Sequence, residues 1–234
     1  MHLQQALKDM ETFSYSVAHD IRSPLKTLYS YVDVLREDYG AILPKEALDH
    51  LQRMELSTKR LDAITRDLLS FARVSSDSIA LRPTFLRAAV GEALLSVPGV
   101  SSASVSVEIS DEVDRVMAHD AVLQQVLRNL LENACKFVPA GTNPILLIAA
   151  RQEAHYVRLS IKDNGIGIRP EHQQKVFKMF ERIHETTYSG TGLGLAIVAR
   201  AMQKMQGRIG LASEEGQGST FWIDLIKAND LTVP

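Results

Sequence analysis

GTGLGLAI, residues 190–197, places three glycines directly before a run of helix-forming residues. A glycine turn that leads into a helix lets backbone N–H groups approach a ligand closely and directs them, with the helix dipole, at an anion. This stretch therefore predicts a phosphate-binding turn, although a single glycine cluster is also compatible with an ordinary tight turn. The residues of the predicted turn are Gly190, Thr191, Gly192, Leu193 and Gly194.

Two further glycine clusters flank this turn in the sequence. DNGIG, residues 163–167, follows an alternating run that is typical of a strand, and GQGST, residues 216–220, begins another. Asp163 ends the first run, where its carboxylate can accept a hydrogen bond from an exocyclic amine. Each cluster alone could also be a tight turn. The candidate binding residues of the two clusters are Asp163, Gly165, Gly167 and Thr220.

NLLENACKF, residues 129–137, is a helical stretch with polar side chains at a regular spacing. Asn129, Asn133 and Lys136 share one helix face by i, i+4 and i+7 spacing. An Asn oxygen can help hold a Mg2+ ion whose other ligands are phosphate and water, and a lysine can meet phosphate as a point charge. A solvated helix face would account for Asn129 alone, but it accounts poorly for all three residues.

Composition excludes several classes of protein. The chain has 234 residues, 45% hydrophobic and 23% charged, with a formal net charge of -2, so no basic field favours nucleic acid or anionic lipid. Its apolar stretches are far shorter than the roughly 18 to 20 residues that span a bilayer. The single cysteine, Cys135, excludes an intrachain disulfide, and the first residues lack the layout of a secretory signal. We therefore expect a cytoplasmic protein with no membrane segment in this chain and no nucleic-acid partner.

Residues 1–78 predict two long helices joined by a short loop, because helix breakers are confined to Pro24, Gly40 and Pro44. Apolar residues recur at three- and four-residue steps, so each helix has one apolar face. A two-helix hairpin buries only one side of each stripe, and every large side chain left exposed forgoes about 1.5 to 3 kcal/mol. We therefore predict a homodimer in which two hairpins form a four-helix bundle. After the proline, the first stripe contains Leu25, Leu28, Val32 and Leu35.

The small polar residues 74–78 predict a hinge that separates the hairpin, residues 1–78, from a second domain, residues 79–234. In the second domain, short alternating or β-branched runs are interleaved with helical patterns, which is typical of an α/β sandwich. The expected fold class is therefore α+β, with a helical hairpin followed by this sandwich. The predicted strands are 105–109, 145–151, 156–162 and 219–226, and the predicted helices are 86–95, 121–137 and 193–205.

The order of these motifs resembles the catalytic core of sensor histidine kinases. The motifs are the Asn helix at 129–137, Asp-x-Gly-x-Gly at 163–167, Phe-x-x-Phe at 177–180, Gly-x-Gly-x-Gly at 190–194 and Gly-x-Gly at 216–218. The resemblance implies that residues 1–78 are a dimerisation and histidine-phosphotransfer domain. It also implies that residues 79–234 are a catalytic ATP-binding domain of the type shared with gyrase, mismatch-repair ATPases and heat-shock chaperones.

The resemblance assigns roles to the candidate residues, with ATP and Mg2+ as cofactors. Asp163 would bind adenine, Asn133 and Asn129 the metal, and Lys136 and the 190–194 turn the phosphates. Relatives that hydrolyse ATP carry a glutamate one turn before the magnesium-binding Asn, whereas this chain has Asn129 there. Hydrolysis is therefore expected to be slow, with the γ-phosphoryl group reserved for another acceptor.

FSYSVAHDIRSPL, residues 13–25, is similar to the phosphoacceptor box of the same kinases. The similarity implies that His19 is the nucleophile and Asp20 its base, because an imidazole nitrogen attacks when a neighbour takes the proton of the other nitrogen. His119 and Asp120 repeat the dipeptide without a following Pro-Leu. We expect this second pair to be structural, with Asp120 as the N-cap of the Asn helix.

The implied function is the core of a two-component system. ATP-dependent autophosphorylation of His19 would be followed by phosphoryl transfer to an aspartate of a response-regulator receiver domain. The phosphoacceptor context is similar to kinases joined to soluble phytochrome or PAS sensors, so an N-terminal sensor domain outside this sequence is expected. Ser23 stands where relatives with phosphatase activity carry an amide or threonine, which leaves that activity open. A non-catalytic phosphorelay or dimerisation scaffold and an ATP-driven conformational clamp are the alternative functions.

Three aromatic residues near the predicted nucleotide site have structural and functional interpretations. Phe137 either stacks on adenine or closes the core after the Asn helix. Phe177 and Phe180, three residues apart, are expected to anchor the base of a short lid, residues 181–189, by burial. Within this lid, Arg182 is a candidate phosphate ligand.

Overall fold

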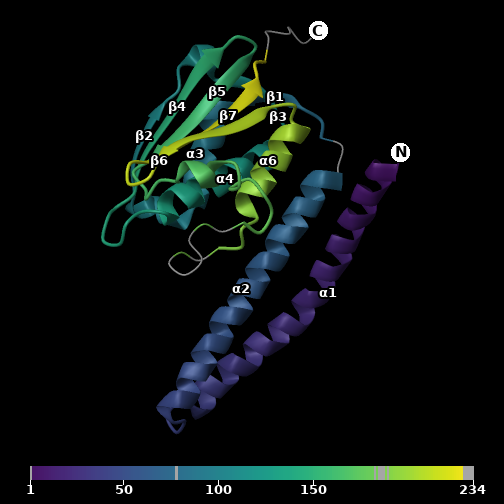
Figure 1. Ribbon diagram of the computed structural model, residues 1–234, viewed down its shortest axis with the longest axis vertical. Helices are drawn as coiled ribbons and strands as arrows, with labels where there is room; N and C mark the ends of the chain where they lie inside the picture. Colours follow the sequence, from purple (N-terminus) through teal and green to yellow (C-terminus); the bar gives the residue numbers. More distant parts are fainter. Residues whose placement is uncertain (1, 77–78, 182, 184–187, 189, 229–234) are drawn as a thin grey trace. The chain divides into compact units, whose positions relative to one another are not determined.

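The computed structural model describes residues 2–76, 79–181, 183, 188 and 190–228. The chain divides into two units, Met1–Ser76 and Asp77–Pro234, which are described separately below (Figure 1). The expected class, a helical hairpin followed by an α/β sandwich, is confirmed. No helix in the described ranges has both the length and the apolar character needed to cross a membrane.

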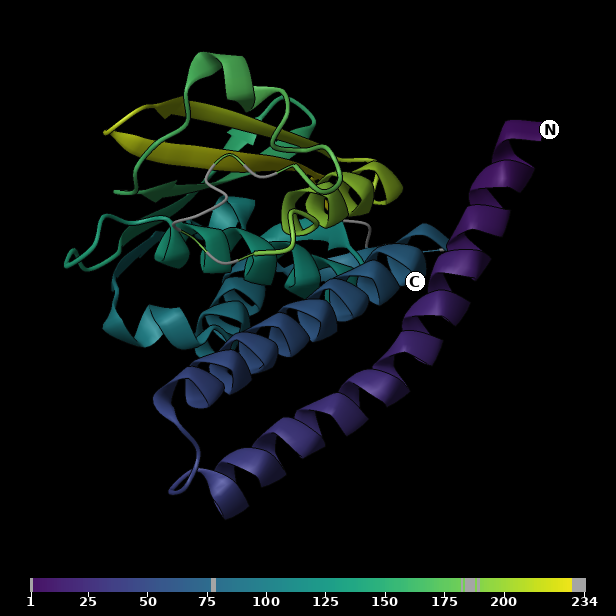
Figure 2. The ribbon, with the colours of Figure 1, turned by 60° about the horizontal axis from the view of Figure 1, so that its bottom comes forward.

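The first unit is a hairpin of two long helices, α1 (His2–Tyr39) and α2 (Lys45–Ser76) (Figure 2). The predicted breakers act differently from one another. Pro24 lies inside α1 without ending it, although its ring removes one backbone N–H and restrains the turn before it. The turn between the helices begins at Gly40, whose N–H donates to the Arg36 carbonyl at 3.1 Å.

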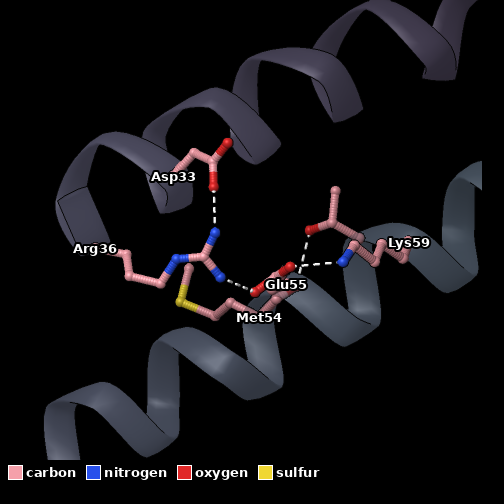
Figure 3. A network of polar contacts seen from close by, with 6 residues as sticks. Asp33, Arg36, Met54, Glu55 and Lys59 are labelled. Carbon is pink, nitrogen blue, oxygen red and sulfur yellow. Dashed lines mark hydrogen bonds and ion pairs between the residues drawn. The ribbon is translucent and has the colours of Figure 1, made fainter. Parts of the chain in front are cut away.

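A charged network joins the two helices near this turn (Figure 3). Arg36 of α1 donates to Glu55 of α2 at 2.6 Å and to Asp33 of its own helix at 2.6 Å. Lys59 donates to the other oxygen of Glu55 at 2.6 Å. The hydrogen bond from Lys59, with the charges of Arg36 and Lys59, holds the pKa of Glu55 below its ordinary value. The network therefore fixes which turns of α1 and α2 face each other.

The apolar stripe of α1 is divided between two environments. Leu25 and Val32 are buried, whereas Leu28 and Leu35 are 48% and 41% exposed. Helix α2 shows the same division, with Leu51 buried and several large apolar residues exposed. The exposed apolar residues of the described hairpin are Ile21, Leu28, Tyr31, Val34, Leu35, Tyr39, Ile42, Met54, Leu56 and Leu61. The hairpin thus leaves many large apolar side chains uncovered in the single chain.

The second unit contains a five-stranded and a two-stranded sheet. The larger sheet has the order β2-β4-β5-β7-β6, in which only the β2–β4 pair is parallel, and the smaller sheet pairs β1 with β3. The strands are β1 (Arg82–Phe85), β2 (Ser104–Glu108), β3 (Arg115–Ala118), β4 (Ile145–Glu153), β5 (Tyr156–Asp163), β6 (Arg208–Glu214) and β7 (Gly218–Ile226). The four predicted strands are all present, as β2, β4, β5 and β7.

Helices cover one face of the larger sheet, as Figure 2 shows. Helix α4 packs on β5 and α6 packs on β6, while α3 packs on α4. Their contact with the sheet buries alternate strand residues such as Leu159 and Ile161. The helices are α3 (Leu86–Ser96), α4 (Asp120–Lys136), α5 (Pro170–Gln173) and α6 (Gly194–Lys204), with 3-10 turns η1 (Pro98–Ser102) and η2 (Asp111–Val113).

Two local expectations are wrong. Residues 74–76 of the expected hinge continue α2, because their backbone completes its last turn; residues 77–78 lie outside the described residues. Asp120 is not the N-cap of α4: His119 has the extended cap backbone, and Asp120 is the first helical residue. The Asp120 carboxylate instead accepts a hydrogen bond from Thr84 Oγ1 at 2.7 Å, which links the start of α4 to β1.

The uncovered face of the larger sheet carries a buried ion pair across β5 and β7. Arg158 donates from Nε and Nη2 to the two oxygens of Asp224 at 2.7 and 2.9 Å. The Asp224 side chain is 3% exposed and that of Arg158 25%. Trp222, the single tryptophan of the chain, has its ring 3.9 Å from the Arg158 guanidinium. The Trp222 ring shields the Arg158–Asp224 ion pair from water, and this desolvation strengthens the attraction between the two charges.

We predict that Asp224→Ala lowers the free energy of unfolding of the second unit by about 2 to 3 kcal/mol, because the variant leaves a partly buried guanidinium without its carboxylate. Denaturant unfolding followed by Trp222 fluorescence measures this value. The matched control is Glu215→Ala, which breaks the exposed Arg169–Glu215 pair of the same unit and should cost less than about 1 kcal/mol. Equal losses of the free energy of unfolding in both variants would contradict a stabilising role of the Arg158–Asp224 pair.

Candidate functional site

Helix α4 supplies the polar side chains that the sequence predicted to share one face. It begins with Asp120 and ends with Lys136, so its terminal charges complement the helix dipole. Asn129 is 8% exposed, and its Nδ2 donates to the Gln125 carbonyl at 2.9 Å. Asn133 and Lys136 are half-buried. Asn129 is therefore buried, and the alternative interpretation, a solvated helix face, does not apply to it.

The glycine turn before α6 lies directly against this face of α4. A Cβ added at Gly190 would lie 2.7 Å from Lys136 Nζ, and one added at Gly194 would lie 3.0 Å from Asn129 Oδ1. Gly192 has φ +75°, a backbone conformation that other residues rarely adopt. The structure thus brings the predicted phosphate turn to the Asn helix, two segments separated by more than fifty residues in the sequence.

Within the turn, Thr191 and Leu193 have different roles. The Leu193 N–H donates to Thr191 Oγ1 at 3.2 Å, and the Leu193 side chain is fully buried. The buried side chain anchors the turn to the core. Because α6 begins at Gly194 and runs for 11 residues, the backbone N–H groups of its first turn have no carbonyl partners within the helix. The arrangement suits an anion at this end of α6.

Asp163 lies at the end of β5 and is 7% exposed. Its Oδ1 accepts the N–H groups of Gly165 at 2.8 Å and Ser219 at 3.1 Å, and no donor from the described residues reaches Oδ2. Burial raises the pKa of Asp163, while the two backbone hydrogen bonds act in the opposite direction. One carboxylate oxygen is thus fixed by the protein and the other is left for a ligand.

The loop that carries Asp163 is tied to the end of α4. The Ile166 N–H donates to the Phe137 carbonyl at 2.9 Å, and the Gly216 N–H donates to the Ile166 carbonyl at 2.8 Å. Gly167, with φ +69°, lies against the backbone of Glu214. These bonds bring all three glycine clusters to the carboxyl-terminal half of α4.

Thr220 does not belong to the site. It pairs with Lys162 across β5 and β7, so its side chain lies on the same face as that of Lys162, opposite to Asp163. Its neighbour Ser219 is buried on the side of Asp163 and donates its backbone N–H to that carboxylate. We therefore replace Thr220 with Ser219; the one-residue error arises because side chains alternate along a strand.

The expected anchoring of the lid base by Phe177 and Phe180 is also wrong in part. Helix α5 ends at Gln173, so the two residues do not share a helix face. Phe177 is half-buried and Phe180 is 57% exposed, whereas Val176 is buried. Phe180 is held by its backbone instead, since its N–H donates to the Gly192 carbonyl at 2.9 Å.

An aromatic pair closes the end of α4, and the sequence did not indicate its second member. The rings of Phe137 and Tyr188 lie 5.3 Å apart, and Tyr188 donates its hydroxyl to the Val138 carbonyl at 2.9 Å. Lys136 Nζ lies 4.5 Å from the centre of the Phe137 ring. Both interpretations of Phe137 therefore stay predictions.

Of the predicted lid, Arg182, His184, residues 185–187 and Ser189 lie outside the described residues.

The predicted acceptor residues belong to the other unit. His19 and Asp20 are consecutive residues of α1, one turn before Pro24. The Asp20 side chain is exposed, while the side chain of His19 lies outside the described part of the chain.

The site in the second unit has a carboxylate acceptor at one end and an ammonium group with free helical N–H groups at the other. It suits a ligand that carries an amine and an anionic chain.

Comparisons with known proteins agree with this chemistry. Residues 9–77 match the family described as His Kinase A (phospho-acceptor) domain, and residues 118–229 match the histidine kinase-, DNA gyrase B- and HSP90-like ATPase family. The phytochrome-like protein Cph1 of Synechocystis sp. is 31% identical over 96% of this chain and 30% of its own length. The methanogenesis regulatory histidine kinase FilI of Methanothrix harundinacea is 34% identical over 90% of this chain and 24% of its own length.

A solved structure extends the likeness to the fold. Full-length ShkA in complex with AMPPNP superimposes with a TM-score of 0.69 and 27% identity, covering 93% of this chain and 46% of ShkA. The chain spans less than a third of the length of Cph1 and of FilI. The comparison therefore concerns one shared part of longer proteins.

We predict a specific pH dependence for Asp163→Asn, which keeps an oxygen to accept both backbone N–H groups but carries no charge. Because burial raises the folded-state pKa of Asp163, the folded protein takes up its proton before the unfolded chain does as the pH falls. The free energy of unfolding of the wild type should therefore rise relative to the variant as the pH is lowered through the raised folded pKa toward about 4. Trp222 fluorescence in denaturant at several pH values measures the difference; a difference that moves the other way would contradict the prediction.

Proposed function

The chain belongs to the sensor histidine kinases, as the catalytic core of a two-component system, and from this we propose that it autophosphorylates His19 with ATP and passes the phosphoryl group to an aspartate of a response regulator. One observation carries the proposal: α4 holds Asn129 and Lys136 against the glycine turn while Asp163 keeps one oxygen for a ligand. These groups match the two ends of ATP.

Each end of ATP has its own partners in this proposal. The exocyclic amine of adenine donates to Asp163 Oδ2, which is desolvated and therefore forms a strong hydrogen bond. Lys136 and the backbone N–H groups at the start of α6, from Gly194 onward, bind the phosphates. The AMPPNP bound to ShkA supports nucleotide binding at this kind of domain.

The residues present also fit Mg2+, provided that the ion arrives with the nucleotide. The described residues contain no group of three or more His, Cys, Asp or Glu side chains that could hold a metal by themselves. Amide oxygens of Asn133 and Asn129 would supplement phosphate and water ligands, as Mg2+ prefers. Of the two, Asn133 is the more accessible, since Asn129 is packed beside Gly194. Bound Mg2+ neutralises phosphate charge during transfer.

The transfer step joins the two units. A bond forms between an imidazole nitrogen of His19 and the γ-phosphorus, the bond from that phosphorus to the ADP oxygen breaks, and Asp20 takes the imidazole proton. Asp20 is exposed on α1, which suits a base that must meet a second unit. Positioning and charge neutralisation supply most of the rate.

Water is a poor competitor of His19 in this site. Relatives that hydrolyse ATP have a glutamate where this chain has Asn129, and an amide cannot take a proton from water. The Asn129 amide is in addition engaged with the Gln125 carbonyl. Glu132, the nearest carboxylate along the helix, is exposed and directly precedes Asn133, so it lies on another side of α4. This supports a kinase over an ATP-driven clamp.

The proposal includes a homodimer and further partners. The uncovered apolar residues of α1 and α2 support a four-helix bundle of two hairpins. A preceding sensor domain of the phytochrome or PAS type is supported by the 31% identity to Cph1, although FilI is equally similar. A response-regulator receiver domain is the expected acceptor. The cytoplasmic setting is part of the same proposal.

Incubation with γ-labelled ATP and Mg2+ tests this function. We expect label on the protein that is stable in alkali and labile in acid, as phosphohistidine is. The label should be lost in His19→Gln and reduced at least about tenfold in Asn133→Ala, which removes a ligand at the phosphates. Free phosphate release without labelled protein would instead indicate the clamp, and label accepted only from another phosphoprotein would indicate the relay scaffold.

The chain offers a matched control for the acceptor. His119 is followed by Asp120 like His19 by Asp20, but it caps α4 in the second unit. His119→Gln and His50→Gln, the latter exposed on α2, should retain the label. If the label persists in His19→Gln and disappears in one of these variants, the phosphoacceptor is the histidine replaced in that variant.

A further inference from the structure

Behind Asp163 lies a cluster of hydrogen bonds centred on Ser213 of β6. The Ile168 N–H donates to Ser213 Oγ at 2.8 Å, and Ser213 Oγ donates to the Gly218 carbonyl at 2.9 Å. A third contact joins Ser213 Oγ to Ser219 Oγ at 2.9 Å. Ser213 pairs directly with Ser219 across β6 and β7, so both side chains lie on one face of the sheet.

The number of protons decides the direction of the third contact. A serine hydroxyl has one proton and two lone pairs. Ser213 uses its proton on the Gly218 carbonyl and one lone pair on the Ile168 N–H, so its remaining lone pair must accept the proton of Ser219. The Ser219 hydroxyl therefore donates to Ser213, and it can only accept a hydrogen bond from a ligand.

Ser219 is the residue that also holds Asp163. Its backbone N–H donates to Asp163 Oδ1 at 3.1 Å, and both residues are buried. By the strand register the Ser219 side chain lies on the same face of the sheet as that of Asp163, so this face carries two acceptors of hydrogen bonds, the second oxygen of the carboxylate and the hydroxyl of Ser219. An amine has protons for both acceptors, whereas a carbonyl oxygen has none.

We propose that Ser213 is a positioning residue that fixes the Ser219 hydroxyl as an acceptor and so favours adenine over a 6-oxo purine. This rests on the proposed function, since it refines how that site selects its nucleotide. Ser213 acts through Ser219 and makes no contact with the ligand. A site built of acceptors disfavours a 6-oxo purine, because its carbonyl supplies no proton and its single N1–H can serve only one of the two buried acceptors.

The test compares the dissociation constants of ATP and inosine triphosphate, both with Mg2+, for the full chain. Inosine triphosphate carries a carbonyl where ATP carries the amine. In Ser213→Ala the Ser219 hydroxyl can rotate and donate, so the preference for ATP should fall about fivefold to tenfold, as expected for one hydrogen bond. Ser213→Thr, which restores a hydroxyl on a strand, should keep the wild-type preference.

Three further variants separate this role from a structural one. Ser219→Ala leaves the bonds of Ser213 to Ile168 and Gly218 in place and should lower the preference by a similar factor, even if Ser213→Ala does not fold. The double variant should match Ser219→Ala, because Ser213 acts through that hydroxyl. Ser160→Ala is the control: Ser160 donates to the Ala149 carbonyl at 3.1 Å on the other face of the sheet and should change nothing.

The outcomes distinguish this inference from the proposed function. If Ser213→Ala weakens ATP and inosine triphosphate by the same factor, Ser213 merely joins two loops and the inference is overturned, while labelling of His19 still stands. An additive double variant would overturn it as well. If the wild-type chain takes up neither nucleotide, the proposed function fails first and this inference fails with it.

Discussion

The nucleotide site depends on a steric constraint at helix α4. The chain that crosses α4 at residues 190–194 lies so close that side chains at Gly190 and Gly194 would meet Lys136 and Asn129. Glycine at these two points leaves the Lys136 ammonium and the Asn129 amide in place beside the backbone of the turn. The proposed phosphate end of the site therefore lies where the backbone of the turn meets two polar side chains of α4.

The other end of the site depends on burial. Asp163 lies in a desolvated position that raises its pKa, and two backbone N–H groups partly compensate this by donating to one of its oxygens. The same loop is bonded to the Phe137 carbonyl at the end of α4, so the adenine end and the phosphate end share one helix as their reference. Spacing between the two ends is thus set by α4, and a ligand of the wrong length cannot reach both. In the proposed mechanism, the absence of a carboxylate at position 129 directs the reaction away from water.

The elements whose sequence signals are local could be predicted from the sequence alone. The long helices and four of the strands could be predicted because their periodicity extends over enough residues, and the glycine clusters marked the site. The short strands β1 and β3, four residues each, offer too few positions to show alternation. Thr220 was chosen over Ser219 because the phase of a strand is set by its pairing with a neighbour. Tyr188 and Ser213 were missed for a related reason, since each forms a hydrogen bond with a segment distant in the sequence, at Val138 and Ile168 respectively.

The single parallel pair in the sheet has a consequence for the order of folding. Strand β2 pairs with β4, and about forty residues that include β3 and α4 must be placed between them first. Such non-local pairing slows folding, whereas the hairpin of α1 and α2 is built from contacts close in the sequence. Synthesis from the amino terminus favours the same order. We therefore expect the helical stalk to be complete, and able to meet a second copy, while the nucleotide-binding unit is still being assembled on the ribosome.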